Sequence, residues 1–168
     1  VLSILEWRKR LLANQPMNGT TPLEIADALD REAAAALQAL PELRARQADN
    51  KELRLTLGDI EAMSYLAQYY AAKIRGAAEL ALFDGAGDPK RRDAALRHLR
   101  AAVGYWEEYA EAFTAQYEQP RLYNRVGWVN IPEAIAKVRR DVDLARQWKP
   151  GTVSAEQMIR GADRPFRK

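Results

Sequence analysis

The chain of 168 residues contains no cysteine and a single histidine, His98. Disulfides, thiolate metal sites and cysteine nucleophiles are therefore excluded, while the redox compartment stays open. No apolar run approaches the roughly 20 residues that cross a bilayer, so we expect no membrane partner. No signal peptide is apparent and the first residue is Val1, so we expect the chain to be a segment of a longer protein.

An excess of charge of one sign is also lacking, with 26 basic and 23 acidic residues. The basic residues are scattered along the chain, which argues against a nucleic-acid partner. Alanines follow His98 at i+3 and i+4, so no ligand stands at helical spacing, and we expect no metal or other cofactor. Glu107 and Glu111 lie one helical turn apart, which is more typical of a solvated face than of a catalytic pair. The sequence offers no catalytic residues, and a small enzyme acting alone is the least favoured interpretation.

Helix-forming patterns are abundant. Alanine is common and β-branched residues are few, which favours helix. Between residues 96 and 117, apolar residues are spaced 3, 4, 3, 4, 3, 4, at Leu96, Leu99, Val103, Trp106, Ala110, Phe113 and Tyr117. Such a seam is typical of a helix that buries one side against other helices. We predict an all-α fold, an antiparallel bundle of four main helices plus a shorter N-terminal helix, over residues 1–150, with a mostly irregular tail at 151–168.

Local signals predict where the helices begin and end. A first amphipathic helix covers residues 1–14. Thr21, Pro22 and Glu24 match a capping box that begins the second helix, and Pro41 is expected to end it. A glycine-rich turn at 84–87 precedes the fourth helix, which is expected to reach about residue 118. A loop at 119–129 precedes the fifth, where residues 130–133 repeat the capping pattern.

The third helix is expected to run from about residue 49 to 83. Leucines alternate at 53–57 as they would in a strand, but such a strand has no partner, so we favour helix with a break at Gly58. Gly76 is expected to allow close approach of a neighbouring helix. The predicted buried stripe of this helix consists of Ile60, Met63, Ala67, Tyr70, Ile74, Ala78 and Ala81.

Aromatic residues are concentrated on the third and fourth helices, at Tyr65, Tyr69, Tyr70, Tyr105, Trp106, Tyr109 and Tyr117. Their helical spacing indicates core or half-buried positions for most of them, with hydroxyl groups that reach polar partners. A ligand groove between the helices is the less favoured alternative.

The loop at 119–129 carries the strongest candidate site. It places aromatic, amide and guanidinium groups outside regular structure, at Arg121, Tyr123, Asn124, Arg125 and Trp128. An aromatic face beside planar donors suits a sugar or a partner surface. The alternative is that Leu122 and Trp128 form a hydrophobic plug at one end of the bundle. A buried Arg125 would need a carboxylate, which another domain would supply.

Residues 52–83, residues 96–117 and the loop segment 124–129 resemble an α-helical domain near the C-terminus of large bacterial carbohydrate-active enzymes of glycoside hydrolase type. The resemblance implies that a barrel elsewhere in the parent enzyme is catalytic and that these helices pack beside it. No catalytic residue carries over, because no catalytic motif of such enzymes is present. The chain would then be a non-catalytic accessory domain, with other domains of the parent and carbohydrate as partners. The alternative is a helical protein–protein interaction module, which should expose an apolar patch along the first or the tyrosine-rich helix.

Overall fold

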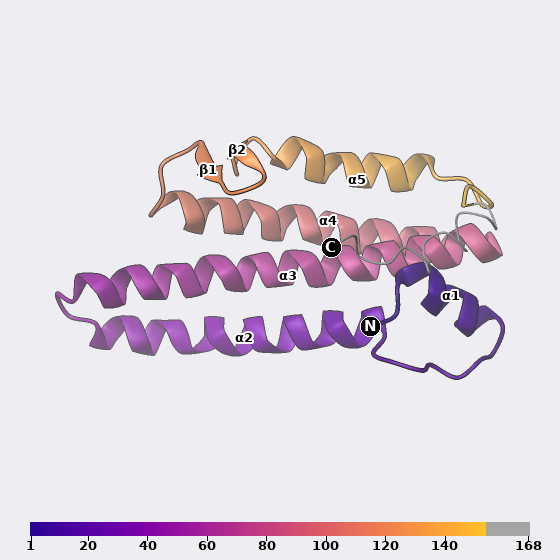
Figure 1. Ribbon diagram of the computed structural model, residues 1–168, viewed down its shortest axis with the longest axis horizontal. Coiled ribbons are helices and arrows are strands. Elements are labelled where there is room, and N and C mark those ends of the chain that lie inside the picture. Colours follow the sequence, from indigo (N-terminus) through magenta and orange to yellow (C-terminus); the bar gives the residue numbers. More distant parts are fainter. Residues whose placement is uncertain (154–168) are drawn as a thin grey trace.

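The computed structural model describes residues 1–153 and is mostly helical. Its elements are α1 (Ile4–Leu12), α2 (Pro22–Arg46), α3 (Lys51–Ala86), α4 (Pro89–Thr114), β1 (Arg121–Tyr123), β2 (Gly127–Val129) and α5 (Ile135–Gln147). The main contacts join α2 to α3, α3 to α4 and α4 to α5, and α1 packs on α3. Figure 1 shows α2 to α5 side by side along the long axis, which is compatible with a bundle. The predicted all-α character is confirmed, apart from a small two-stranded sheet.

The seam on α4 is buried as predicted. Every seam residue is buried or half-buried, and Leu99 packs in a core cluster with Leu80 and Phe83 of α3. Gly76 of α3 lies against this seam, because a Cβ atom added there would stand 2.8 Å from Leu99 Cδ2. The close approach expected at Gly76 is therefore confirmed.

The predicted beginning of α2 is confirmed and its predicted end is wrong. Thr21 Oγ1 accepts a hydrogen bond from Glu24 N, and Glu24 Oε2 accepts one from Thr21 N at 2.7 Å, which completes the capping box. Pro41 lies inside the helix, which continues past it to the last residue of α2. The proline removes one backbone donor, but the packing of α2 on α3, with Leu40 buried next to the proline, offsets that loss.

The third helix is continuous and longer than predicted. It has no break at Gly58, and the segment 53–57 is helical with Leu57 buried. Asn50 is the N-cap, because Asn50 Oδ1 accepts a hydrogen bond from the backbone of residue 53 at 3.0 Å. The turn predicted at 84–87 is the last turn of α3 together with its cap, Gly87, which has a φ of 70°. A C-terminal glycine in this left-handed conformation is a common way to end a helix.

The fifth helix begins later than predicted. Glu133 N donates to Asn130 Oδ1 at 3.2 Å, as a capping box requires, but Glu133 Oε1 accepts from the side-chain Nδ2 of Asn130 at 2.8 Å. Both contacts close a turn ahead of α5. The carbonyl of Ile131 accepts a hydrogen bond from Trp106 Nε1 at 3.1 Å. That carbonyl is thereby engaged outside the helix, and the first helical turn starts at Ile135.

A buried ion pair joins α1 to the C-terminal end of α3. Arg8 Nη1 donates to Asp84 Oδ2 at 2.7 Å, and the two side chains are only 5% and 2% exposed. Asp84 Oδ1 accepts hydrogen bonds from Trp148 Nε1 at 2.9 Å and Val153 N at 3.2 Å. Burial raises the pKa of Asp84, but the hydrogen bonds from Trp148 and Arg8 outweigh it and lower that pKa. One carboxylate therefore holds α1, α3 and the segment after α5 together.

The predicted irregular tail at 151–168 can be compared with the structure only as far as residue 153. Residues 148–153, after α5, contain no helix or strand. The rest of the tail that was predicted to be mostly irregular, residues 154–168, lies outside the described residues. Within residues 1–153, no helix is both long enough and apolar enough to cross a membrane.

Candidate functional site

The segment predicted as an irregular loop at 119–129 folds as a β-hairpin. Strands β1 and β2 pair antiparallel, with Leu122 opposite Trp128. The connection includes Arg125 at a φ of 68° and leads into Gly127 at 87°. Both values lie in the left-handed region that tight hairpin connections require. Strands of three residues are too short for alternation to be recognised in the sequence, so the hairpin was not predicted.

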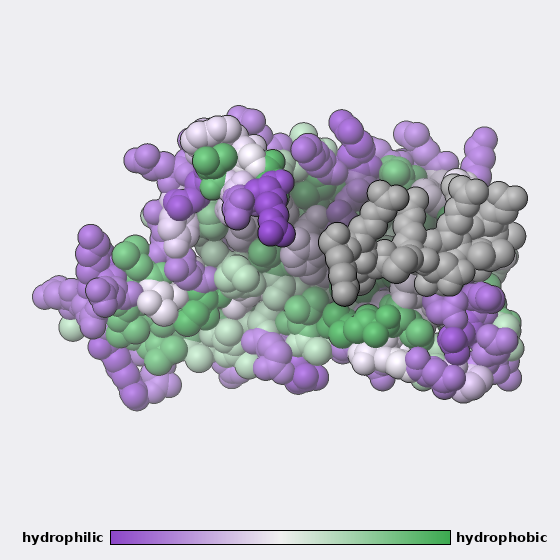
Figure 2. All heavy atoms as spheres, in the orientation of Figure 1, coloured by the Kyte–Doolittle hydropathy of each residue, from purple (hydrophilic) through white to green (hydrophobic). Residues whose placement is uncertain are grey.

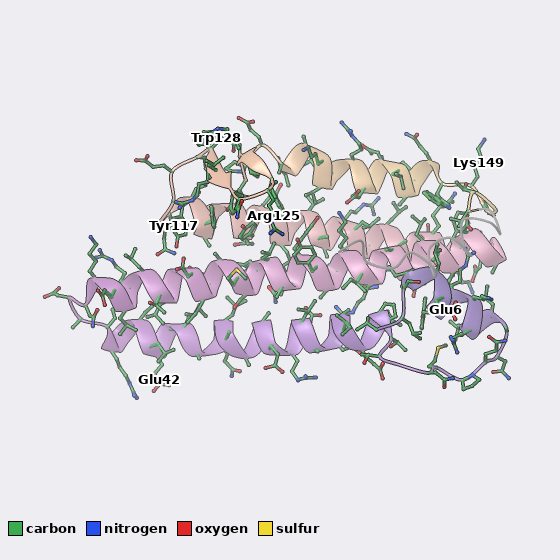
Figure 3. All side chains as sticks on the ribbon, in the orientation of Figure 1. Glu6, Glu42, Tyr117, Arg125, Trp128 and Lys149 are labelled. Carbon is green, nitrogen blue, oxygen red and sulfur yellow. The ribbon has the colours of Figure 1, made fainter. Side chains whose placement is uncertain are left out.

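Alternation along the strands sends the candidate residues to two sides of the hairpin. Arg121 and Tyr123 line a pocket of about 390 Å³ with residues of α3 and α4. Leu122 and Trp128 are 66% and 70% exposed, and Figure 3 shows Trp128 at the outer edge of the molecule. The plug interpretation of Leu122 and Trp128 is therefore wrong, because the pleat of the sheet directs both side chains to solvent.

The tip of the hairpin carries the remaining candidates. Asn124 and Arg125 are both exposed. Arg125 is therefore not a buried cation that needs a carboxylate from another domain. Figure 3 shows its side chain extending from the hairpin across α4 in this view, on the side opposite to Trp128. The structure thus brings Arg121 and Tyr123 together and separates both from Trp128.

The pocket is walled by groups that hold one another in place. The Arg121 guanidinium lies 4.5 Å from the centroid of the Tyr117 ring. Tyr117 Oη donates to Asp59 Oδ1 at 2.7 Å, and Gln116 Nε2 donates to the same oxygen at 3.1 Å. The hydrogen bond to Asp59 raises the pKa of Tyr117. These contacts draw the chain from α4 onto α3, which explains why α4 ends at Thr114 rather than near residue 118.

A row of stacked aromatic rings leads along α4 to this pocket. Successive ring centroids lie 4.8 to 5.6 Å apart through Tyr69, Trp106, Tyr109, Phe113 and Tyr117. Edge-on and tilted contacts of this kind are favourable. Burial, with smaller contributions from two neighbouring tyrosines, raises the pKa of Tyr109 to about 12. The prediction that most of these aromatics are core or half-buried is confirmed.

The structure exposes part of α3 that was predicted to be buried. We call Ile60, Met63, Ala67, Tyr70 and Ile74 the α3 stripe. Met63 is 62% exposed and Tyr70 is 50% exposed; Ile60 is exposed, while Ala67 and Ile74 are half-buried. The predicted burial of Ile60, Met63 and Tyr70 is therefore wrong. Ala78 and Ala81, which continue the same row, are buried as predicted.

The neighbours of α3 explain this difference. The residues of α3 that are buried in its central turns are mostly small, at Ala62, Ser64, Ala71, Ala72 and Gly76. Small side chains let helices approach closely, so α2 and α4 occupy those sides and leave the larger residues of the stripe uncovered. Figure 2 shows hydrophobic residues gathered along α2 and α3 on this face. Met63 also lines the hairpin pocket, so the stripe and the pocket form one continuous surface.

The structure also places the acidic residues and the histidine that the sequence singled out. Residues 1–153 contain no group of three or more acidic or histidine residues able to hold a metal ion. Glu107 is exposed and pairs with Arg139 at 2.7 Å, as expected for a solvated helix face. His98 is half-buried, and burial together with the charge of Arg75 lowers its pKa. What the structure offers is a binding surface of apolar, aromatic and cationic groups. No family model, curated protein or solved structure matches the chain.

Proposed function

We propose that the chain is a non-catalytic helical docking domain that binds a partner segment on the α3 stripe. The exposure of Met63 and Tyr70 within a regular helical row carries the proposal. Single exposed apolar residues are ordinary on protein surfaces, but a contiguous row is typical of an interaction site. The adjoining pocket of about 390 Å³ adds aromatic walls to this surface. Recognition of a helix in an apolar groove uses surfaces of this kind.

We further propose that the domain belongs to a larger enzyme of glycoside hydrolase type, as the resemblance of its sequence implies. In that enzyme α2 to α5 would form an antiparallel four-helix bundle, with α1 as a shorter fifth helix. Short connections and the packing of each helix on the next support this architecture. The coding sequence around these residues tests the parent. An upstream alternation of strands and helices would support it, and an initiating methionine directly at this start would contradict it.

A helical peptide with one apolar face should bind to the stripe. The test peptide has leucine and alanine at 3–4 spacing and glutamine at its polar positions, and carries a fluorescent label. We expect anisotropy to show binding that weakens at least about tenfold in Met63→Gln/Tyr70→Gln. Losing two buried apolar contacts, each worth about 1.5–3 kcal/mol, is more than sufficient for that change.

The matched control for this experiment is Leu144→Gln. Leu144 is an exposed apolar residue of α5, so the substitution removes similar surface away from the stripe. The control should bind the peptide as the unaltered chain does. Absence of peptide binding, or equal affinity in the stripe variant, would contradict the docking function.

A second candidate, carbohydrate binding, is favoured by the exposure of Trp128. Its indole is 70% exposed and borders a pocket of about 380 Å³ that Asn130, Glu133 and Lys137 also line. An exposed aromatic face beside polar groups suits the apolar and hydroxyl surfaces of a sugar.

Calorimetric titration with oligosaccharides tests the carbohydrate candidate. We expect heat of binding at about millimolar ligand, a weak affinity worth about 4 kcal/mol, and we expect Trp128→Ala to abolish it. Val126→Ala, at the neighbouring hairpin tip, is the control and should keep most of the heat. A folded chain that gives no heat would leave the hairpin without a carbohydrate role.

A further inference from the structure

We propose that the α3 stripe binds an amphipathic helix of a partner protein. The edge of that helix that faces the hairpin is acidic. This inference rests on the docking function proposed above and specifies the chemistry of the partner. Three features of the structure support it: the packing of α1, the length and spacing of the open stripe, and the cations of the hairpin.

The packing of α1 shows how a helix sits on this row of α3. Trp7 of α1 is buried in a cluster with Ala78 and Leu82. One turn further along α3, a Cβ atom added at Gly85 would lie 3.0 Å from Leu12 Cδ1. An amphipathic helix of nine residues therefore covers the C-terminal end of the row that begins with the stripe, and Figure 1 shows α1 at that end of α3. The open stripe continues the same packing surface.

The open part has the dimensions of a second short helix. From Ile60 to Ile74 the stripe spans about 21 Å, at 1.5 Å for each residue, which matches a helix of about 14 residues. Its residues are spaced 3, 4, 3, 4, as in a helix-packing seam. The small Ala67 lies between the large Met63 and Tyr70, so a partner side chain fits between them as a knob in a hole.

The hairpin places positive charge along one edge of the α3 stripe. Arg121 lines the pocket beside Met63 and stacks on Tyr117. Arg125 is exposed at the hairpin tip. Within residues 1–153, neither guanidinium contacts a carboxylate. The carboxylate of Asp59 accepts hydrogen bonds from Gln116 and Tyr117, in the segment after α4. Two such cations attract negative charge, so they favour glutamate or aspartate on the part of the partner that faces the hairpin.

A second copy of this chain fits the α3 stripe less well than a short partner helix does. The only long helix that exposes such a stripe is, within the described residues, α3 itself, and its 36 residues extend about 54 Å. Laid on the stripe of another copy, it would run beyond the open 21 Å and meet α1.

The experiment compares three labelled peptides of about 16 residues, each held helical by a side-chain staple, with one apolar face and with glutamate, glutamine or lysine at the polar positions. We expect anisotropy to show the glutamate peptide binding about fivefold tighter than the glutamine peptide, and the lysine peptide more weakly than both. The preference should shrink at about 0.5 M salt. Arg121→Gln/Arg125→Gln should remove the preference and leave the affinity of the glutamine peptide within about twofold.

The control Arg97→Gln/Arg140→Gln makes the same change of net charge at exposed positions of α4 and α5, and it should keep the preference. Equal binding of the three peptides, or a preference that survives Arg121→Gln/Arg125→Gln, would overturn the inference while the docking function stands. Binding of none of them would overturn both. A dimer in light scattering that Met63→Glu dissociates would instead assign the stripe to a second copy.

Discussion

Replacing Asp84 by alanine is expected to lower the free energy of unfolding by about 3–5 kcal/mol. The substitution removes the Asp84 carboxylate that pairs with the buried Arg8 guanidinium, and breaking a buried ion pair from one side costs about this much in other proteins. It also removes the acceptor of the Trp148 indole and of the Val153 amide. Urea denaturation followed by circular dichroism at pH 7 measures the change.

The control for this substitution is Asp143→Ala. Asp143 pairs with Arg146 at 2.7 Å, but both side chains are more than half exposed. Exposed pairs contribute about 0–1 kcal/mol. A second variant, Arg8→Met/Asp84→Leu, removes both charges and should recover much of the lost stability. If Asp84→Ala costs no more than Asp143→Ala, the buried ion pair does not hold α1 to α3.

The same residue gives this stability a pH dependence. The pKa of Asp84 is lowered in the folded chain, so its contribution is complete above the unfolded value of about 3.9. The contribution is lost as the pH falls from there through the folded pKa. The difference in stability between the unaltered chain and Asp84→Ala should therefore be largest near neutral pH and shrink below about pH 4.

The sequence predicted those elements whose signals are local. The seam of α4 was recognisable because its apolar residues repeat at 3–4 spacing on an otherwise polar helix. The capping box at Thr21 was recognisable because three residues within one turn satisfy each other's backbone groups. In both cases the physical cause lies within a few residues of its effect.

The exposure of the α3 stripe was not predictable in the same way. This helix is apolar on several sides, so periodicity alone does not decide which side its neighbours cover. One signal was present, however. Small residues such as Ala71 and Gly76 allow close helix contact, whereas Met63 and Tyr70 keep neighbours at a distance. Size as well as hydropathy would have separated the packed side from the open side.

Contacts between distant residues were beyond sequence reasoning. Arg8 and Asp84 are separated by 76 positions, and no spacing rule links them. The division of the candidate site likewise depends on strand pairing, which places Leu122 and Trp128 on one side and Arg121 on the other. The sequence therefore indicated the residues of the hairpin but not the surface that each of them joins.

Leu99→Ala is expected to destabilise the chain by about 2–5 kcal/mol, because it leaves a cavity in the cluster formed with Leu80 and Phe83. Gly76→Ala should be neutral or destabilising by up to about 2 kcal/mol. Its new methyl group meets Leu99 Cγ and Cδ2 at 2.8 Å, which costs about 1–3 kcal/mol. Better helix propensity returns about 1 kcal/mol.

Combining the two substitutions should reverse the effect of Gly76→Ala. With Leu99 shortened, the clash disappears, the added methyl group fills part of the cavity, and the gain in helix propensity remains. Gly76→Ala should then stabilise the Leu99→Ala chain by about 1 kcal/mol in thermal and urea unfolding. Gly104→Ala is the control, because a Cβ atom there meets nothing within 4 Å, and it should stabilise both backgrounds by about 0.5–1 kcal/mol. If Gly76→Ala destabilises both backgrounds equally, the carbonyl of Ala95, at 3.4 Å, rather than Leu99 limits how closely α3 and α4 approach.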